Sequence, residues 1–88
     1  MYSLRLVHSA ARDLERLDRP VASRILRKLR WLSENVVRMN HQPLKGDFSG
    51  LYKVREGDYR IVYEVLRQEE TIVVHMIGHR REVYKPSR

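Results

Sequence analysis

The pattern of apolar and polar positions changes its period along the chain. In residues 2–8 apolar and polar side chains alternate, with Tyr2, Leu4 and Leu6 on one side, which is typical of a β-strand. From residue 21 to about residue 39, apolar side chains recur at the three- and four-residue spacing of an amphipathic helix. The chain therefore begins with a strand and continues into helix.

Two start signals divide the helical region. Ser9 can cap a short helix that continues to about Leu17. Asp18 is then a second N-cap candidate, and Pro20 lies in the first turn after it, where proline is favoured. We expect two consecutive helices, the second of them longer and with a basic outer face.

The second half of the chain has the composition of a sheet. Residues 40–50 are rich in Gly, Pro, Asn and Asp and are expected to be irregular. Strands are predicted at residues 51–55, 59–66 and 71–78. The last is apolar on both faces, so we expect it inside the sheet. The prediction is a single α+β domain over residues 1–88, in the order β-α-α-β-β-β. Two N-terminal helices would pack on one face of a mainly antiparallel, four-stranded sheet.

The charge of the chain indicates a polyanionic partner. The chain has 18 Lys and Arg against 11 Asp and Glu, a net charge of +7 and a pI near 10.2. A folded surface with this field attracts nucleic acid or an acidic protein. Cysteine is absent, and no apolar run approaches the roughly 20 residues that span a bilayer. The N-terminus lacks the layout of a signal peptide, so we expect a cytoplasmic protein without a membrane partner.

The predicted hairpin around residue 57 gathers three basic side chains. A two-residue turn at Glu56 and Gly57 would place Lys53 directly opposite Arg60. Apolar side chains would then share one face, and Lys53, Arg55 and Arg60 the other. Like charges across a ladder are destabilising, so such a cluster suggests that an anion binds between them. The alternative is a set of solvated side chains on an open sheet face.

Arg80 and Tyr84 extend this cluster beyond the last predicted strand. Cleavage of RNA by its own 2′-hydroxyl needs a base, an acid and a group that stabilises the phosphorane dianion. Arginine suits the last task because its planar fork binds phosphate with two parallel bonds. The acidic and histidine side chains have no metal-ligand spacing, so neither a metal nor another cofactor is expected.

Four sequence runs carry a resemblance to a known family. They are PLKG at residues 43–46, LYKVR at 51–55, DYRIVY at 58–63 and GHRREVY at 78–84. In order and spacing they resemble the RelE family of toxins, over essentially the whole chain. The resemblance implies a RelE-like, microbial-RNase-type fold. The same fold is shared by ParE-type toxins, which inhibit a protein target such as DNA gyrase and do not cleave RNA.

The resemblance implies the toxin of a type II toxin-antitoxin system. Its activity would be that of a ribosome-dependent, metal-independent endoribonuclease, or mRNA interferase, which cuts mRNA in the decoding site and so inhibits translation. Implied partners are mRNA, 16S rRNA and an acidic, RelB-like antitoxin, with operator DNA as a ligand of the complex. The antitoxin would cover the exposed helix face and the apolar residues Val62 and Leu66. The alternative is a ParE-like toxin that is not a nuclease.

The resemblance also assigns roles to residues. The family's active-site set matches Lys53, Arg55, Arg60, Arg80 and Tyr84. By this match Lys53 and Arg60 would hold the scissile phosphate. Arg80 would stabilise the phosphorane or assist the leaving group, and Tyr84 would stack on the nucleotide.

One position departs from the family pattern. Arg55 stands where the best-known branch has a lysine that can act as base, and arginine is a poor base at neutral pH. His79, or Lys53 with a lowered pKa, is then the candidate base. Further RNA contacts are expected from three basic residues: Lys45, Arg81 and Lys85.

Overall fold

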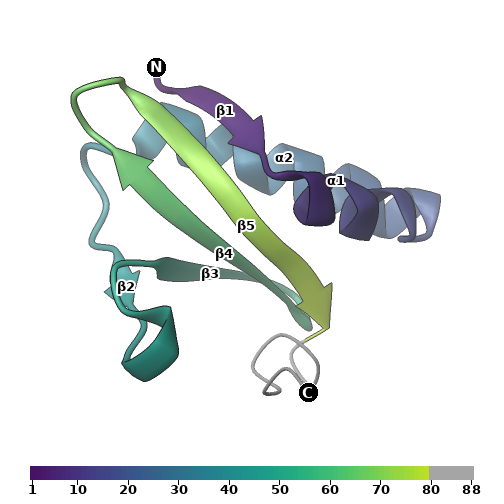
Figure 1. Cartoon of the computed structure of the whole chain (residues 1–88). Coiled ribbons are helices and arrows are strands. Elements are labelled where there is room, and N and C mark those ends of the chain that lie inside the picture. Colours follow the sequence, from purple (N-terminus) through teal and green to yellow (C-terminus); the bar gives the residue numbers. More distant parts are fainter. Residues whose placement is uncertain (80–88) are drawn as a thin grey trace.

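The computed structural model describes residues 1–79 and shows a five-stranded mixed sheet with both helices on one face (Figure 1). The elements are β1 (Ser3–Leu6), α1 (His8–Glu15), α2 (Arg19–Asn35), β2 (Gln42–Pro43), the 3-10 helix η1 (Gly46–Phe48), β3 (Tyr52–Glu56), β4 (Tyr59–Leu66) and β5 (Thr71–His79). The predicted α+β class and element order are confirmed.

The sheet has one strand more than predicted. Its strand order is β1-β5-β4-β3-β2, with β1 parallel to β5 and all other pairs antiparallel. The additional strand, β2, lies in the segment expected to be irregular, and pairs Gln42 with Lys53 and Pro43 with Tyr52. Proline is tolerated there because β2 is an edge strand. β5 lies between β1 and β4, as its apolar sequence predicted.

Helix α1 begins one residue before its predicted cap. Val7, and not Ser9, occupies the N-cap position. The reason is that the Val7 N–H still donates to the Val74 carbonyl at 3.0 Å, so the chain turns into the helix directly after β1. Asp13 on this helix accepts a hydrogen bond from the Ile77 N–H at 3.3 Å. That contact satisfies a backbone N–H of β5 beyond Val74, where the pairing with β1 ends.

Helix α2 begins as predicted, with Asp18 at the N-cap position and Pro20 in the first turn, although the Asp18 side chain makes no capping bond. The predicted end near residue 39 is wrong, because the helix ends at Asn35. The Asn35 amide donates to the Trp31 carbonyl at 2.8 Å, which satisfies one acceptor of the last turn.

Both helices contribute to one core on their side of the sheet. The buried cluster combines residues of α1, α2, β4 and β5 with one residue that follows α2: Ala10, Ile25, Leu29, Leu32, Val36, Ile61, Tyr63, Ile72, Val74 and Ile77. Within residues 1–79, no helix is both long and apolar enough to cross a membrane. The fold thus supports β3 and β4 from the helix side, while the other face carries polar side chains together with the buried Val62 and Val73.

Candidate active site

The β3–β4 hairpin turns at Gly57 and Asp58, and the predicted turn at Glu56 and Gly57 is wrong. Gly57 has φ +60°, a conformation that glycine adopts without strain. Arg55 therefore pairs with Arg60, and Lys53 with Val62. The register differs from the predicted one by two residues, so no side chain changes face. Lys53, Arg55 and Arg60 share one face as predicted, but the direct partner of Arg60 is Arg55.

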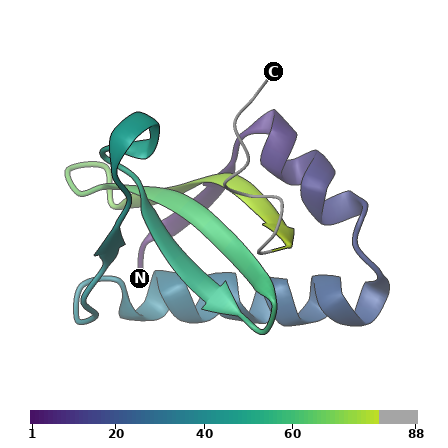
Figure 2. The same cartoon turned by 90° about the horizontal axis from the view of Figure 1, so that it is seen from below.

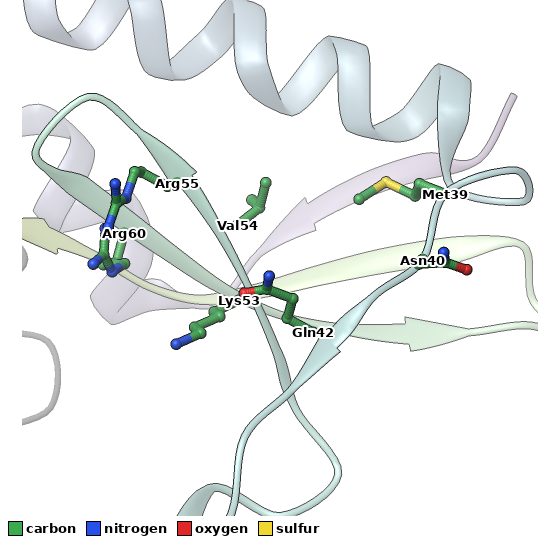
Figure 3. A pocket seen from close by; sticks show the side chains of 7 residues that line it. All are labelled: Met39, Asn40, Gln42, Lys53, Val54, Arg55 and Arg60. Carbon is green, nitrogen blue, oxygen red and sulfur yellow. The ribbon is translucent and has the colours of Figure 1, made fainter.

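These three cations line a pocket of about 310 Å³. Strand β2 pairs with β3 only as far as Lys53, so within residues 1–79 no strand pairs with the edge of β3 beyond Lys53. The other wall is formed by Met39 and Asn40, which lie between α2 and β2, and by Gln42 of β2 (Figure 3). Figure 3 shows the side chains of Arg55 and Arg60 close together at one end.

Arg60 is placed at an electrostatic cost. Its Nε and Nη1 atoms are buried, and among residues 1–79 they have no hydrogen-bond partner. Its direct cross-strand neighbour is a second guanidinium, that of Arg55. Buried donors without partners and facing like charges both destabilise the fold. A bound anion with several oxygens, such as phosphate, would remove both costs.

A buried hydrogen-bond chain fixes the far wall of this pocket. His41 lies between the pocket residues Asn40 and Gln42, and its Nε2–H donates to the Val36 carbonyl at 2.8 Å. Its Nδ1 accepts from the Tyr63 hydroxyl at 2.5 Å. Burial, with a smaller contribution from Tyr52, raises the pKa of Tyr63 to about 12, so that Tyr63 remains a neutral donor. The wall is thereby tied to both the end of α2 and the centre of the sheet.

The other predicted site residues are placed differently. His79 pairs with Tyr59, and their rings meet edge-on at 5.7 Å between centroids. Tyr59 packs against the core on the helix side, so His79 lies on the face opposite Arg60. Lys45 is exposed beyond β2 and is not among the residues that line the pocket. Four predicted residues lie outside the described part of the chain: Arg80, Arg81, Tyr84 and Lys85.

Sequence reasoning missed the pocket wall after α2. Met39, Asn40 and Gln42 fall in a region interpreted as an irregular loop. The available signal was that two amide side chains, Asn40 and Gln42, alternate with His41 along the chain. Across residues 1–79, no three His, Asp or Glu side chains are grouped so that they could hold a metal ion.

Comparison with known proteins agrees with this architecture. Residues 4–84 match the sequence model of the ParE toxin of type II toxin-antitoxin systems, parDE. The chain is 30% identical over 84 residues to toxin RelE of Mycobacterium tuberculosis, covering 96% of this chain and 87% of that one. It is 27% identical over 85 residues to toxin RelG of the same organism, covering 96% and 97%.

Solved structures show the same fold. The toxin-antitoxin complex RelBE2 from Mycobacterium tuberculosis contains a chain with TM-score 0.80 and 26% identity, covering 89% of this chain and 96% of that one. The isolated RelE toxin of E. coli has TM-score 0.76 at 23% identity, covering 100% and 89%. The chain therefore belongs to the RelE/ParE superfamily, as a RelE-type toxin of a toxin-antitoxin system.

Proposed function

We propose that this toxin is a ribosome-dependent, metal-independent endoribonuclease that cuts mRNA by attack of a 2′-hydroxyl on the adjacent phosphate. The observation that supports it best is the position of Arg60 beside Arg55 and Lys53 in one pocket, with two of its guanidinium nitrogens buried and without a partner among residues 1–79. A ring of cations repels a divalent metal ion but stabilises a phosphorane dianion directly. The chemistry then depends on side chains alone.

Each cation of the pocket has a role in this proposal. Arg60 donates Nε–H and Nη–H bonds to two oxygens of the scissile phosphate, and Arg55 donates to the same group from the opposite strand. Lys53 is the candidate base for the 2′-hydroxyl, because arginine is a poor base. Its neutral amine would accept the proton, and the resulting ammonium would add a third positive charge beside the phosphorane. His79 is on the other face and is not assigned this role.

Residues beyond the described part of the chain complete the proposed site. By resemblance to the family, Arg80 stabilises the phosphorane or assists the leaving oxygen, and Tyr84 stacks on the nucleotide. Lys45, Arg81 and Lys85 contact RNA outside the reacting centre. These assignments rest on sequence motifs.

The proposed partners follow from charge and from the relatives. The pocket is open to solvent along the edge of β3, so the ribosome has to position the messenger, a contribution that can reach several kcal/mol. Because the proposed activity depends on the ribosome, we also propose contacts with 16S rRNA and a cytoplasmic location. A net charge of +7 complements an acidic antitoxin, and a similar solved chain is part of a toxin-antitoxin complex. We propose a RelB-like antitoxin, whose complex with the toxin binds operator DNA.

The test is cleavage of one messenger in vitro, with and without ribosomes. We expect ribosome-dependent cleavage that falls on the order of a hundredfold in Arg60→Ala, as the loss of one transition-state donor typically costs. Arg67→Ala removes an exposed arginine in the β4–β5 turn and should retain full activity. Equal rates with and without ribosomes would refute the ribosome dependence. Full activity of Arg60→Ala would refute the site.

The second candidate function is ParE-like inhibition of a protein target such as DNA gyrase. It is favoured by the family model, which is that of the ParE toxin. The same protein preparation distinguishes the two functions. Inhibition of gyrase supercoiling, without cleavage of ribosome-bound mRNA, would establish this candidate in place of the nuclease.

A further inference from the structure

We propose that α2 carries a second nucleic-acid site. It binds a single-stranded RNA segment adjoining the one bound in the pocket of Lys53, Arg55 and Arg60, here called the phosphate pocket. The site is the flank of α2 formed by Arg24, Arg27, Lys28 and Trp31, here called the α2 flank. With Glu56 from the end of β3, these residues line a separate pocket of about 280 Å³. Glu56 ends β3 directly before the β3–β4 turn, and Figure 2 shows that this turn lies over α2 when the molecule is seen from below.

The spacing of these residues on α2 concentrates positive charge. Positions three, four and seven residues apart lie on the same side of a helix, so Arg24, Arg27 and Lys28 form one basic stripe. The helix's own ion pair, Arg30 with Glu34, lies outside this pocket. Within residues 1–79, neither Arg24 nor Arg27 has an ion-pair partner. The stripe therefore keeps a field that attracts phosphate groups.

Trp31 provides the second recognition element. Its side chain is 42% exposed, unusually open for a large aromatic residue, and the Lys28 Nζ lies 4.4 Å from the ring centroid. Exposed aromatic rings beside basic side chains are the combination that binds single-stranded nucleic acid, by stacking of bases and pairing of phosphates. Lys28 is long and flexible, so it can leave the ring for a phosphate when a base takes its place.

The arrangement favours RNA over an amphipathic acidic peptide. A peptide helix needs a continuous apolar strip on its partner. The other exposed apolar residue of α2 is Leu26, which is 51% exposed. It is five residues from Trp31, which places it about 140° away around the helix. The α2 flank thus presents one planar ring among cations and no apolar groove.

The two pockets lie on opposite sides of the edge of β3. Arg55 lines the phosphate pocket, and the next residue, Glu56, points to the other face and lines the pocket of the α2 flank. Strand β2 stops pairing at Lys53, and among residues 1–79 no strand pairs with this edge beyond it. An extended RNA chain can pass around the edge, with Glu56 accepting hydrogen bonds from base amino groups. This continuity rests on the proposed function, because it takes RNA as the substrate.

The test uses Trp31 as its own probe, since it is the only tryptophan of the chain. A short 2′-O-methyl oligoribonucleotide, which cannot be cut by 2′-hydroxyl attack, is titrated into the toxin and tryptophan fluorescence is recorded. We expect a saturable change that weakens with added salt. The apparent affinity should fall at least tenfold in Arg24→Ala/Arg27→Ala and should be unchanged in Arg5→Ala/Arg67→Ala, the control with equal charge.

Circular dichroism establishes that each variant is folded. Binding of a labelled oligonucleotide to the Trp31→Phe variant, followed by fluorescence anisotropy, repeats the measurement without the tryptophan probe. No saturable response, or equal losses in both double variants, would overturn the inference. So would a response to polyglutamate and none to RNA, which would identify an acidic-peptide site. Because the oligonucleotide cannot be cleaved, the α2 flank is tested even if the toxin proves not to be a nuclease.

Discussion

Arg60→Met should make the toxin more stable and inactive at the same time. The Nε and Nη1 atoms of Arg60 are buried and have no hydrogen-bond partner within the described part of the chain, and its cross-strand neighbour is Arg55. Methionine keeps an unbranched apolar side chain at the site but removes the charge and all donors. The substitution therefore relieves a cost of the folded state while it removes the proposed phosphate ligand.

The size of the gain follows from two costs. A buried donor without a partner costs about 1–3 kcal/mol. Two like charges directly across a ladder add roughly 0.2–1 kcal/mol. Since methionine also gives up some packing, the net gain in the free energy of unfolding should be about 1–2 kcal/mol. Arg55→Met is the matched control, because Arg55 is exposed and gives up only the smaller, like-charge cost.

The assay is urea unfolding at low ionic strength, with and without inorganic phosphate. Phosphate should stabilise the wild-type protein by mass action, by about 2.7 kcal/mol at a concentration one hundred times its Kd, and should stabilise Arg60→Met much less. Two results would refute the reasoning. One is that Arg60→Met is less stable than the wild-type protein, and the other is that phosphate stabilises both proteins equally.

Two further predictions concern contacts that hold the site from behind. The pKa of Tyr63 is raised from 10.0 to about 12, so its contribution to stability is complete below pH 10 and is lost as pH rises to 12. Tyr63→Phe should flatten that alkaline decline. It should also lower the free energy of unfolding by about 1–3 kcal/mol at neutral pH, because His41 Nδ1 loses its donor. Thermal unfolding as a function of pH measures both effects, and an unchanged alkaline slope would contradict the assignment. Asp13→Ala removes the acceptor of the Ile77 N–H and should lower the free energy of unfolding by about 1 kcal/mol without changing cleavage. Parallel unfolding and activity assays check this, and unaltered stability would show that this contact contributes nothing.

The larger elements could be predicted because their signals are local. The apolar period of α2 and the two-sided apolar sequence of β5 identify a helix and an interior strand, and the structure confirms both. The two residues of β2 carry no such signal. They form a strand only because the edge of β3 is available to pair with them. A strand of this length is created by its partner and not by its own sequence.

The end of α2 was also set by distant contacts. The helical apolar period continues through Val36, which is buried in the core, and this is why the helix was predicted to extend further. The chain leaves the helix after Asn35 because His41 binds back to the Val36 carbonyl and to Tyr63. Tyr63 is far along the sequence, so no local pattern could have shown that the chain turns here. The same contacts place Asn40 and Gln42 in the pocket wall, which explains why these two residues were missed.

The hairpin shows why the shared face of Lys53, Arg55 and Arg60 was predictable when their pairing was not. A turn at Glu56 and Gly57 of the common type I′ requires positive φ at both residues, which costs about 1–2 kcal/mol for a residue other than glycine. The turn at Gly57 and Asp58 requires it only of glycine, and Gly57 has φ +60°. A shift of two residues leaves every side chain on the same face of its strand, so the common face of Lys53 and Arg60 was predicted correctly. The corrected register brings two guanidinium groups directly opposite each other, so a like-charge pair still lies across the ladder. Each guanidinium can bind an anion with two parallel bonds, so the true register favours an anion at this site for the same reason as the predicted one.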